Sequence, residues 1–281
     1  MNHNLIAHSA TVPLTTSIGP FCVIGENVVL GENVILGVGC VLGDGAKVGD
    51  GVELGNYVSI GRGAVIGQRT RIGDHTTIYP QTILGEDGFI GSNSSIGRLP
   101  KASATSTVKA QADMPPLQMG NGFTIGCSAV LYAGTNYADK AFVGDGAVVR
   151  ERCSIGQNVV IGSGVVMEND TKIGEFTKIQ TGSYITAYME IEERVFIAPM
   201  VTTTNDNYMG RTEKRFKEIK GPTIQRGARV GGGSILLPGV KVAPETFVAA
   251  GALVSKDTTG KRVIKGFPAK DLRAVPEDEL L

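Results

Sequence analysis

The sequence contains no tryptophan and only three histidines among its 281 residues. These histidines, His3, His8 and His75, all lie in the first third of the chain. Histidine is the usual general base of enzymes and the commonest metal ligand. We therefore expect the rest of the chain to carry out any acid–base chemistry without it.

Cysteine is also scarce, with four residues at Cys22, Cys40, Cys127 and Cys153. None belongs to a CxxC pair and no histidine cluster lies near them, so neither a metal site nor redox catalysis is indicated. We predict reduced cysteines that pack as small apolar residues, and no bound metal.

Neither sign of charge is in excess, because 27 basic residues balance 27 acidic ones. This balance argues against nucleic acid or an anionic membrane as partners. No stretch approaches the roughly 20 apolar residues of a membrane span, and "MNHNLIAHSA" lacks the basic and apolar regions of a signal peptide. We expect a cytoplasmic protein.

Glycine and small aliphatic residues are abundant, and they recur with a period of six. Most inward positions of this repeat are Ile, Leu or Val followed by glycine. One run extends from Ile18 to Ile96, a second from Met119 to Thr203 and a third from Ile224 to Val254. The period is lost at residues 98–118 and 204–223, which we predict to be loops.

Each hexad supplies one short strand whose aliphatic side chain points inward and whose glycine serves a tight corner. A turn of three hexads, which the resemblance to hexapeptide-repeat proteins implies, would make residues three hexads apart vertical neighbours at the ordinary spacing of paired strands. The predicted fold is an all-β parallel solenoid with two extended loops. Residues 259–281 leave the pattern and are expected to cap it.

The aliphatic-Gly-x-x-small-x pattern resembles the hexapeptide transferase superfamily. That resemblance implies a left-handed parallel β-helix. Under it, residues 1–97 form N-terminal coils that extend the structure, 98–118 a loop, 119–203 catalytic coils, 204–223 a second loop, 224–258 coenzyme-binding coils and 259–281 a C-terminal cap.

Glycine is replaced by polar residues at one corner of the second run. Glu151 should lie under Asn169, and Arg152 under Asp170, which brings Glu151 and Asp170 within several ångströms of each other. Three adjacent polar corners beside a long loop are unusual for a merely solvated edge. We interpret this edge as a surface that binds a ligand.

Four stretches of the second and third runs resemble sugar-nucleotide amine N-acyltransferases, especially those that acetylate dTDP-3-amino-3,6-dideoxyhexoses. They are "VGDGAVVRERCSIG", "MENDTKIGEFTKIQTGSYIT", "TTTNDNYMGRTEKRF" and "AAGALVSKDTTGKRVIKGFPAKDLR". The resemblance implies acetyl-CoA as acyl donor, a homotrimer, a nucleotide-linked amino sugar as acceptor, and Glu151, Asn169 and Asp170 as catalytic residues facing the sugar amine.

Further site residues are assigned on the same corner and loop, and on the third run. The predicted substrate-binding residues are Arg150, Glu168, Tyr188, Asn205, Asp206 and Asn207. The predicted coenzyme-binding residues are Ala187, Gly232, Ser234, Ala250, Lys256, Arg262 and Lys265. Small residues would let a pantetheine arm lie against the backbone, and the cations would neutralise phosphates.

Three alternatives remain open or are disfavoured. An O-acetyltransferase would need a histidine beside the polar edge, and a non-enzymatic scaffold would bind no coenzyme. A γ-class carbonic anhydrase shares the prism but needs three clustered histidines for zinc.

Overall fold

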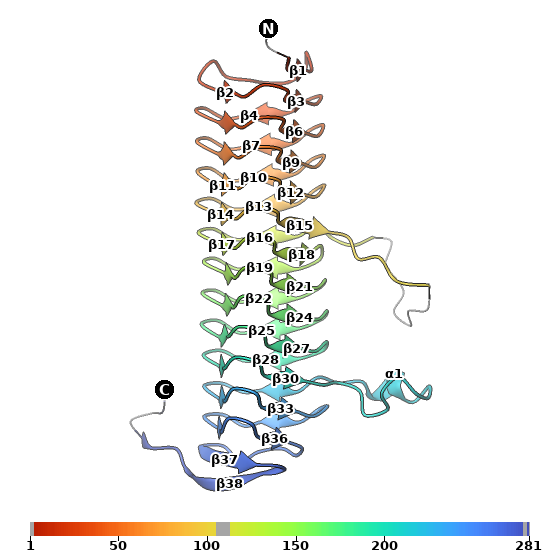
Figure 1. Ribbon diagram of the computed structural model, residues 1–281, viewed down its shortest axis with the longest axis vertical. Coiled ribbons are helices and arrows are strands. Elements are labelled where there is room, and N and C mark those ends of the chain that lie inside the picture. The colour runs from red at the N-terminus through yellow and green to blue at the C-terminus, as the bar shows by residue number, and fades with distance from the viewer. Residues whose placement is uncertain (1–2, 105–112, 278–279, 281) are drawn as a thin grey trace. The chain divides into compact units, whose positions relative to one another are not determined.

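The computed structural model describes residues 3–104, 113–277 and 280. The predicted first loop, 98–118, thus lies partly outside the described residues, and so do the last positions of the predicted cap. The chain divides into two compact units, residues 1–146 and 147–281. Both units are built from short parallel strands wound into a solenoid, as the hexad period predicts, and the architecture is consistent with a left-handed β-helix (Figure 1).

In the first unit the strands form three parallel faces, and most strands have two residues. The first face contains β1 (Leu5–Ile6), β3 (Val23–Ile24), β6 (Val41–Leu42), β9 (Ser59–Ile60), β12 (Thr77–Ile78), β15 (Ser95–Arg98) and β18 (Val130–Tyr132). The second contains β4 (Val29–Leu30), β7 (Lys47–Val48), β10 (Val65–Ile66), β13 (Ile83–Leu84), β16 (Gln118–Met119) and β19 (Asn136–Tyr137). The third contains β2 (Ser17–Ile18), β5 (Ile35–Leu36), β8 (Glu53–Leu54), β11 (Arg71–Ile72), β14 (Phe89–Ile90), β17 (Thr124–Ile125) and β20 (Phe142–Val143).

The second unit repeats this three-faced arrangement. Its first face contains β21 (Val148–Val149), β24 (Val166–Met167), β27 (Tyr184–Ile185), β30 (Thr202–Thr203), β33 (Ile235–Leu236) and β36 (Leu253–Val254). Its second contains β22 (Ser154–Ile155), β25 (Lys172–Ile173), β28 (Glu190–Ile191), β31 (Thr223–Ile224) and β34 (Lys241–Val242). Its third contains β23 (Val160–Ile161), β26 (Lys178–Ile179), β29 (Phe196–Ile197), β32 (Arg229–Val230), β35 (Phe247–Val248), β37 (Arg262–Gly266) and β38 (Ala269–Ala274).

The strand register confirms the turn of three hexads. Val149 pairs with Met167, and Met167 pairs with Ile185. The inward residue of nearly every strand is buried, and each such aliphatic side chain stabilises the fold by about 1.5–3 kcal/mol. The first strand, at Leu5–Ile6, precedes the start of the predicted first run but keeps its phase, because Ile6 pairs with Ile24.

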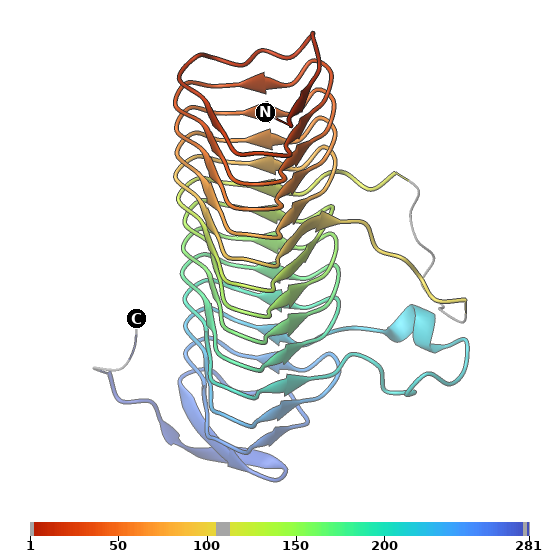
Figure 2. The ribbon, with the colours of Figure 1, turned by 45° about the horizontal axis from the view of Figure 1, so that its top comes forward.

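Successive turns lie so close that the corners following the strands have little room for a side chain. A Cβ placed on Gly174 would lie 2.4 Å from the backbone nitrogen of Glu193 on the next turn. This close approach is the physical reason for the recurrent glycine. Figure 2 shows the corners of each unit stacked in columns.

Three of the four cysteines occupy one recurrent position of the turn, immediately after a corner. The Sγ atoms of Cys22, Cys40 and Cys153 lie 3.2, 3.1 and 3.3 Å from the carbonyl oxygens of Gly37, Gly55 and Glu168 on the next turn. Threonine and serine make the same contact elsewhere, as Thr171 does with Thr186 at 3.2 Å. These three cysteines are buried and free as predicted, whereas Cys127 is exposed, contrary to the prediction, because it lies on a corner.

Two insertions leave the turns without changing the register of the following strands. Ile83 pairs with Gln118 and Glu190 pairs with Thr223, so each of these two turns is longer than three hexads while its strands still pair. The second insertion carries the short helix α1 (Arg215–Glu218) (Figure 1). At the C-terminal end, β37 pairs in parallel with β35 and β38 folds back antiparallel on β37.

No helix among the described residues is long and apolar enough to span a membrane.

Candidate functional site

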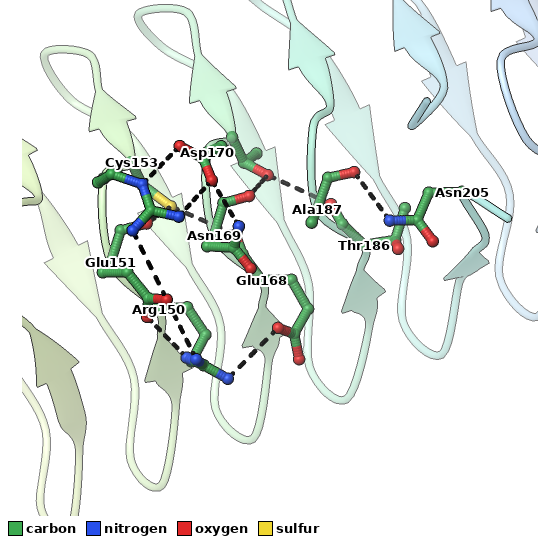
Figure 3. A network of polar contacts seen from close by, with 11 residues as sticks. Arg150, Glu151, Cys153, Glu168, Asn169, Asp170, Thr186, Ala187 and Asn205 are labelled. Atoms are coloured by element: carbon green, nitrogen blue, oxygen red, sulfur yellow. Dashed lines mark hydrogen bonds and ion pairs between the residues drawn. The ribbon is translucent and has the colours of Figure 1, made fainter. Parts of the chain in front are cut away.

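The polar corner predicted from the sequence lies within the second unit. Arg150 to Arg152 follow β21, Glu168 to Asp170 follow β24, and Thr186 to Tyr188 follow β27. The N–H of Asp170 donates to the carbonyl of Glu151, and the N–H of Tyr188 donates to the carbonyl of Asn169, each at 3.2 Å. The three corners are therefore consecutive steps of one column, and their side chains gather on one edge (Figure 3).

Glu151 forms the buried centre of this edge, with 2% of its surface exposed. The guanidinium of Arg150 donates to both carboxylate oxygens, with Nε–Oε2 and Nη2–Oε1 distances of 2.8 and 3.1 Å. The same guanidinium lies 3.6 Å from Oε2 of Glu168 on the next turn. A buried carboxylate is stable only when it is paired in this way.

Arg152 makes the second link across the two turns. Its Nε and Nη2 atoms donate to Oδ1 and Oδ2 of Asp170 at 2.8 and 2.6 Å, and its Nη1 lies 3.9 Å from Oε1 of Glu151. The side chains of Glu151 and Asp170 thus share one guanidinium and face the same edge. This proximity is the relationship that the period of the sequence predicts.

Asn169 donates its side-chain amide to Oδ2 of Asp170 and is itself 7% exposed. Burial raises the pKa of Asp170, but hydrogen bonds from Arg152 and Asn169 and the positive charge of Arg152 outweigh it, so the net pKa lies below the ordinary value. Asp170 is therefore a carboxylate at neutral pH, which accepts hydrogen bonds and binds a proton only weakly.

The next turn supplies the rim of the edge. Tyr188 is 39% exposed, and Ala187 is buried with its carbonyl accepting a hydrogen bond from Nδ2 of Asn205 at 3.4 Å. Burial and the negative charge of Glu168 raise the pKa of Tyr184, which lies on the adjacent strand. The rim is thus polar and partly open to solvent.

The second insertion is organised by Asp206. Its carboxylate accepts hydrogen bonds from the N–H groups of Tyr208 and Gly210 at 2.8 and 2.9 Å and lies 3.2 Å from Nε of Arg215. The two backbone hydrogen bonds, Gly210 first, lower the pKa of Asp206. Asp206 thus holds the loop in shape, whereas the neighbouring Asn207 is exposed.

The residues assigned to the coenzyme lie in two places. Ala187 belongs to the polar edge, whereas Gly232 and Ala250 lie on corners between the third and first faces, further along the second unit. Ser234 is fully buried and its Oγ donates to the carbonyl of Ala249 at 3.1 Å, so its hydroxyl serves the turn. A Cβ added at the neighbouring Gly233 or Gly251 would meet no atom within 4 Å, so there is open space beside the backbone.

The three remaining assigned cations lie near the C-terminal hairpin. Lys256 and Lys265 are exposed, and Nε of Arg262 lies 3.6 Å from Oδ2 of Asp271. The structure therefore brings Arg150, Glu151, Glu168, Asn169 and Asp170 together. Gly232 and Ala250 lie on a different corner, Lys256 follows β36, and Arg262 and Lys265 lie on β37.

Arg152 is absent from the site residues expected from the sequence. Its position three hexads before Asp170 was the signal that could have found it, because that spacing places the two side chains on neighbouring turns. Among the described residues, no cluster of His, Cys, Asp or Glu side chains has the geometry of a metal site.

Two protein families match parts of the chain. Residues 138–169, which include Glu151 and Asn169, match the bacterial transferase hexapeptide (six repeats), and residues 2–99 match the GMPPB C-terminal domain. Part of the segment that builds the polar edge is therefore similar to the hexapeptide repeat of bacterial transferases.

Two curated relatives are acetyltransferases by name. Serine acetyltransferase of Buchnera aphidicola is 32% identical over 90 residues, covering 32% of this chain and 31% of that protein. A putative acetyltransferase of Saccharomyces cerevisiae, YJL218W, is 30% identical over 96 residues, covering 33% and 49%. This chain thus spans less than half the length of these relatives.

A solved structure with partial likeness is an H141A mutant of GDP-perosamine N-acetyltransferase from Caulobacter crescentus, in complex with CoA and GDP-perosamine. It is 17% identical, the match covers 53% of each chain, and the TM-score is 0.32. This likeness carries no inference about the activity of the present chain.

Proposed function

We propose that the protein is an acyl-CoA-dependent N-acyltransferase that acetylates the amine of a nucleotide-linked amino sugar of the dTDP-3-amino-3,6-dideoxyhexose type. The single observation that carries the proposal is the paired arrangement of Glu151 and Asp170 around Arg152 on consecutive turns. The hexapeptide-transferase repeat at residues 138–169 and the two acetyltransferase relatives support acyl transfer.

The charges of the edge favour an amine as the acceptor. Two guanidinium groups, from Arg150 and Arg152, face three carboxylates, from Glu151, Glu168 and Asp170. With all five groups ionised, the three carboxylates outnumber the two guanidinium groups, and the edge has a net charge of minus one. Carboxylate oxygens that remain as acceptors hold an amine by its N–H groups and orient its lone pair.

In the proposed reaction the neutral amine attacks the thioester carbonyl of acetyl-CoA, forming a C–N bond. Collapse of the tetrahedral intermediate breaks the C–S bond and releases a thiolate. The ammonium proton leaves through Asp170 or Glu151 and ends on the thiolate, because a thiol has an ordinary pKa of about 8.5 and binds the proton far better than a carboxylate does. No histidine is needed, since an amine attacks in its neutral form.

The coenzyme is proposed to approach the edge from Ala187 and to extend toward Gly232 and Ala250. The open space beside Gly233 and Gly251 would admit the pantetheine arm, and Lys256, Arg262 and Lys265 would meet the phosphates. Tyr188, Asn205, Asp206 and Asn207 are proposed to border the sugar nucleotide, with Asp206 acting by holding the loop. A homotrimer is proposed as the working assembly, and sedimentation would test it.

The experiment is thiol release from acetyl-CoA with dTDP- and UDP-linked 3-amino and 4-amino sugars, and with the matching hydroxyl sugars as controls. We expect turnover with an amino sugar and none with its hydroxyl counterpart. Turnover with hydroxyl acceptors, including serine, would instead indicate an O-acetyltransferase, which the similarity to serine acetyltransferase makes the second candidate. No turnover with any acceptor would indicate a scaffold.

A further inference from the structure

A second recess lies in the same unit at a different corner, the one between the second and third faces. It has a volume of about 460 Å³ and is lined by Asn158, Phe176, Lys178, Arg194, Val195 and Phe196. The N–H of Phe176 donates to the carbonyl of Gln157, and the N–H of Arg194 donates to that of Glu175, so Asn158, Phe176 and Arg194 stack on consecutive turns. Lys178 and Phe196 are paired in register on β26 and β29.

Two aromatic rings are held at the surface of this recess. Phe176 and Phe196 are each 39% exposed. The guanidinium carbon of Arg194 lies 4.8 Å from the centre of the Phe176 ring, which fixes a flat cationic platform beside the second ring. Exposed aromatic faces beside a stacked guanidinium are a binding surface for a planar ring.

The recess also contains two positively charged side chains. Within the part of the chain that the structure describes, neither Arg194 nor Lys178 forms an ion pair, whereas Glu193, the residue next to Arg194, is paired with Arg226 at 3.1 Å. An uncompensated pair of cations beside aromatic rings favours a ligand that is both flat and anionic. The Asn158 amide adds one donor and one acceptor group for a ring edge.

We propose that this recess binds a nucleoside phosphate, with the base against Phe196 and the Phe176–Arg194 platform, and the phosphate near Lys178 and Arg194. The volume lies within the range of small-ligand sites. A protein partner fits less well, because burying two unpaired cations in an interface is costly. The recess lies on a different corner from the residues proposed above for the coenzyme and the sugar nucleotide, so it would be a further nucleotide site. The source of its ligand is either an adenosine 3′,5′-diphosphate such as that of CoA or a nucleoside diphosphate.

The absence of tryptophan from the sequence allows a reporter at the site itself. In F196W the only indole lies in the recess, and stacking of a base quenches its fluorescence. The matched control is F89W, which places the indole on an exposed strand position of the other unit, where Phe89 is 49% exposed. The titrants are adenosine 3′,5′-diphosphate, dTDP, UDP and inorganic phosphate, and the one that binds most tightly identifies the source.

We expect saturable quenching of F196W by at least one nucleotide and none of F89W. Adding R194Q to F196W should weaken binding about tenfold, whereas adding R226Q should leave it within twofold. Inorganic phosphate should compete only weakly with the nucleotide.

The proposal is overturned if no nucleotide quenches F196W, if R194Q and R226Q behave alike, or if phosphate competes as well as the nucleotide. It is also overturned if R194Q splits an assembly in sedimentation without affecting nucleotide binding. Because binding is read without acyl transfer, the result is independent of the proposed activity.

Discussion

Arg152 and Asp170, three hexads apart in sequence, face each other across consecutive turns through two hydrogen bonds of 2.8 and 2.6 Å. The same guanidinium lies 3.9 Å from Glu151. Arg152 is therefore placed to hold both candidate acids at fixed positions, and its role is open to direct tests.

Replacing Arg152 with glutamine should destabilise the fold by about 1.5 kcal/mol. This is less than the about 3–5 kcal/mol of a fully buried pair, because the Arg152 and Asp170 side chains remain 26% and 29% exposed. Urea unfolding at pH 7 measures the loss. The control is R62Q, which breaks a pair with Asp44 whose side chains are 72% and 46% exposed and should cost about 0.5 kcal/mol or less.

The pH dependence of stability should reveal the same interaction. The folded-state pKa of Asp170 is below its ordinary value of 3.8, so its stabilisation is complete above that value and is lost as the pH falls through the folded pKa. Wild type should therefore lose more stability than R152Q between pH 5 and about pH 2. Equal losses in the two proteins would contradict the assigned cause of the shift.

Reactivity of the thiols tests the placement of the cysteines. Burial raises the pKa of Cys40 to about 11, and Cys22 and Cys153 are also buried, whereas Cys127 is exposed. We expect one of the four thiols to react rapidly with a maleimide in the native protein at pH 7, and all four after unfolding. C127S should abolish the rapid phase, and a remaining fast thiol would contradict the structure.

Two glycines on corners are needed for different reasons: one has no room for a side chain, and the other has a left-handed backbone conformation. Gly174 would place a Cβ 2.4 Å from the backbone of the next turn, whereas Gly164 has a φ of 65° and open space around it. We expect G174A to destabilise the protein by about 3 kcal/mol and G164A by about 1 kcal/mol. Chemical denaturation of both variants gives the comparison, and a larger loss in G164A would be inconsistent with the turn spacing.

Much of this fold follows from the sequence because one physical rule is applied many times. Every sixth residue must fill the same interior, and the resemblance implies a turn of three hexads, so the period and the resemblance together give the partners of Met167. Residues 98–118 and 204–223 escape this rule, and the conformation of the second of these segments depends on local contacts such as those of Asp206 with Gly210.

The candidate site can be predicted from the repeat of the sequence only in part. The register places Glu151 near Asp170, but it does not show that Arg150 turns back onto the adjacent Glu151, which depends on side-chain rotamers. Ser234 shows the opposite case, in which a residue predicted to bind a ligand does something else. Its side-chain hydroxyl donates a hydrogen bond to the carbonyl of Ala249 within the solenoid.

The most direct test of the account is a double-mutant cycle on acetyl transfer with E151Q, D170N and their combination. Each single change should lower kcat by about 100-fold while circular dichroism stays native, and the combined loss should be well below the product of the two, because both side chains act on one amine. E190Q, which alters an exposed carboxylate paired with Lys172, is the matched control and should keep full activity. Unchanged kcat in the double variant would contradict the proposed amine site.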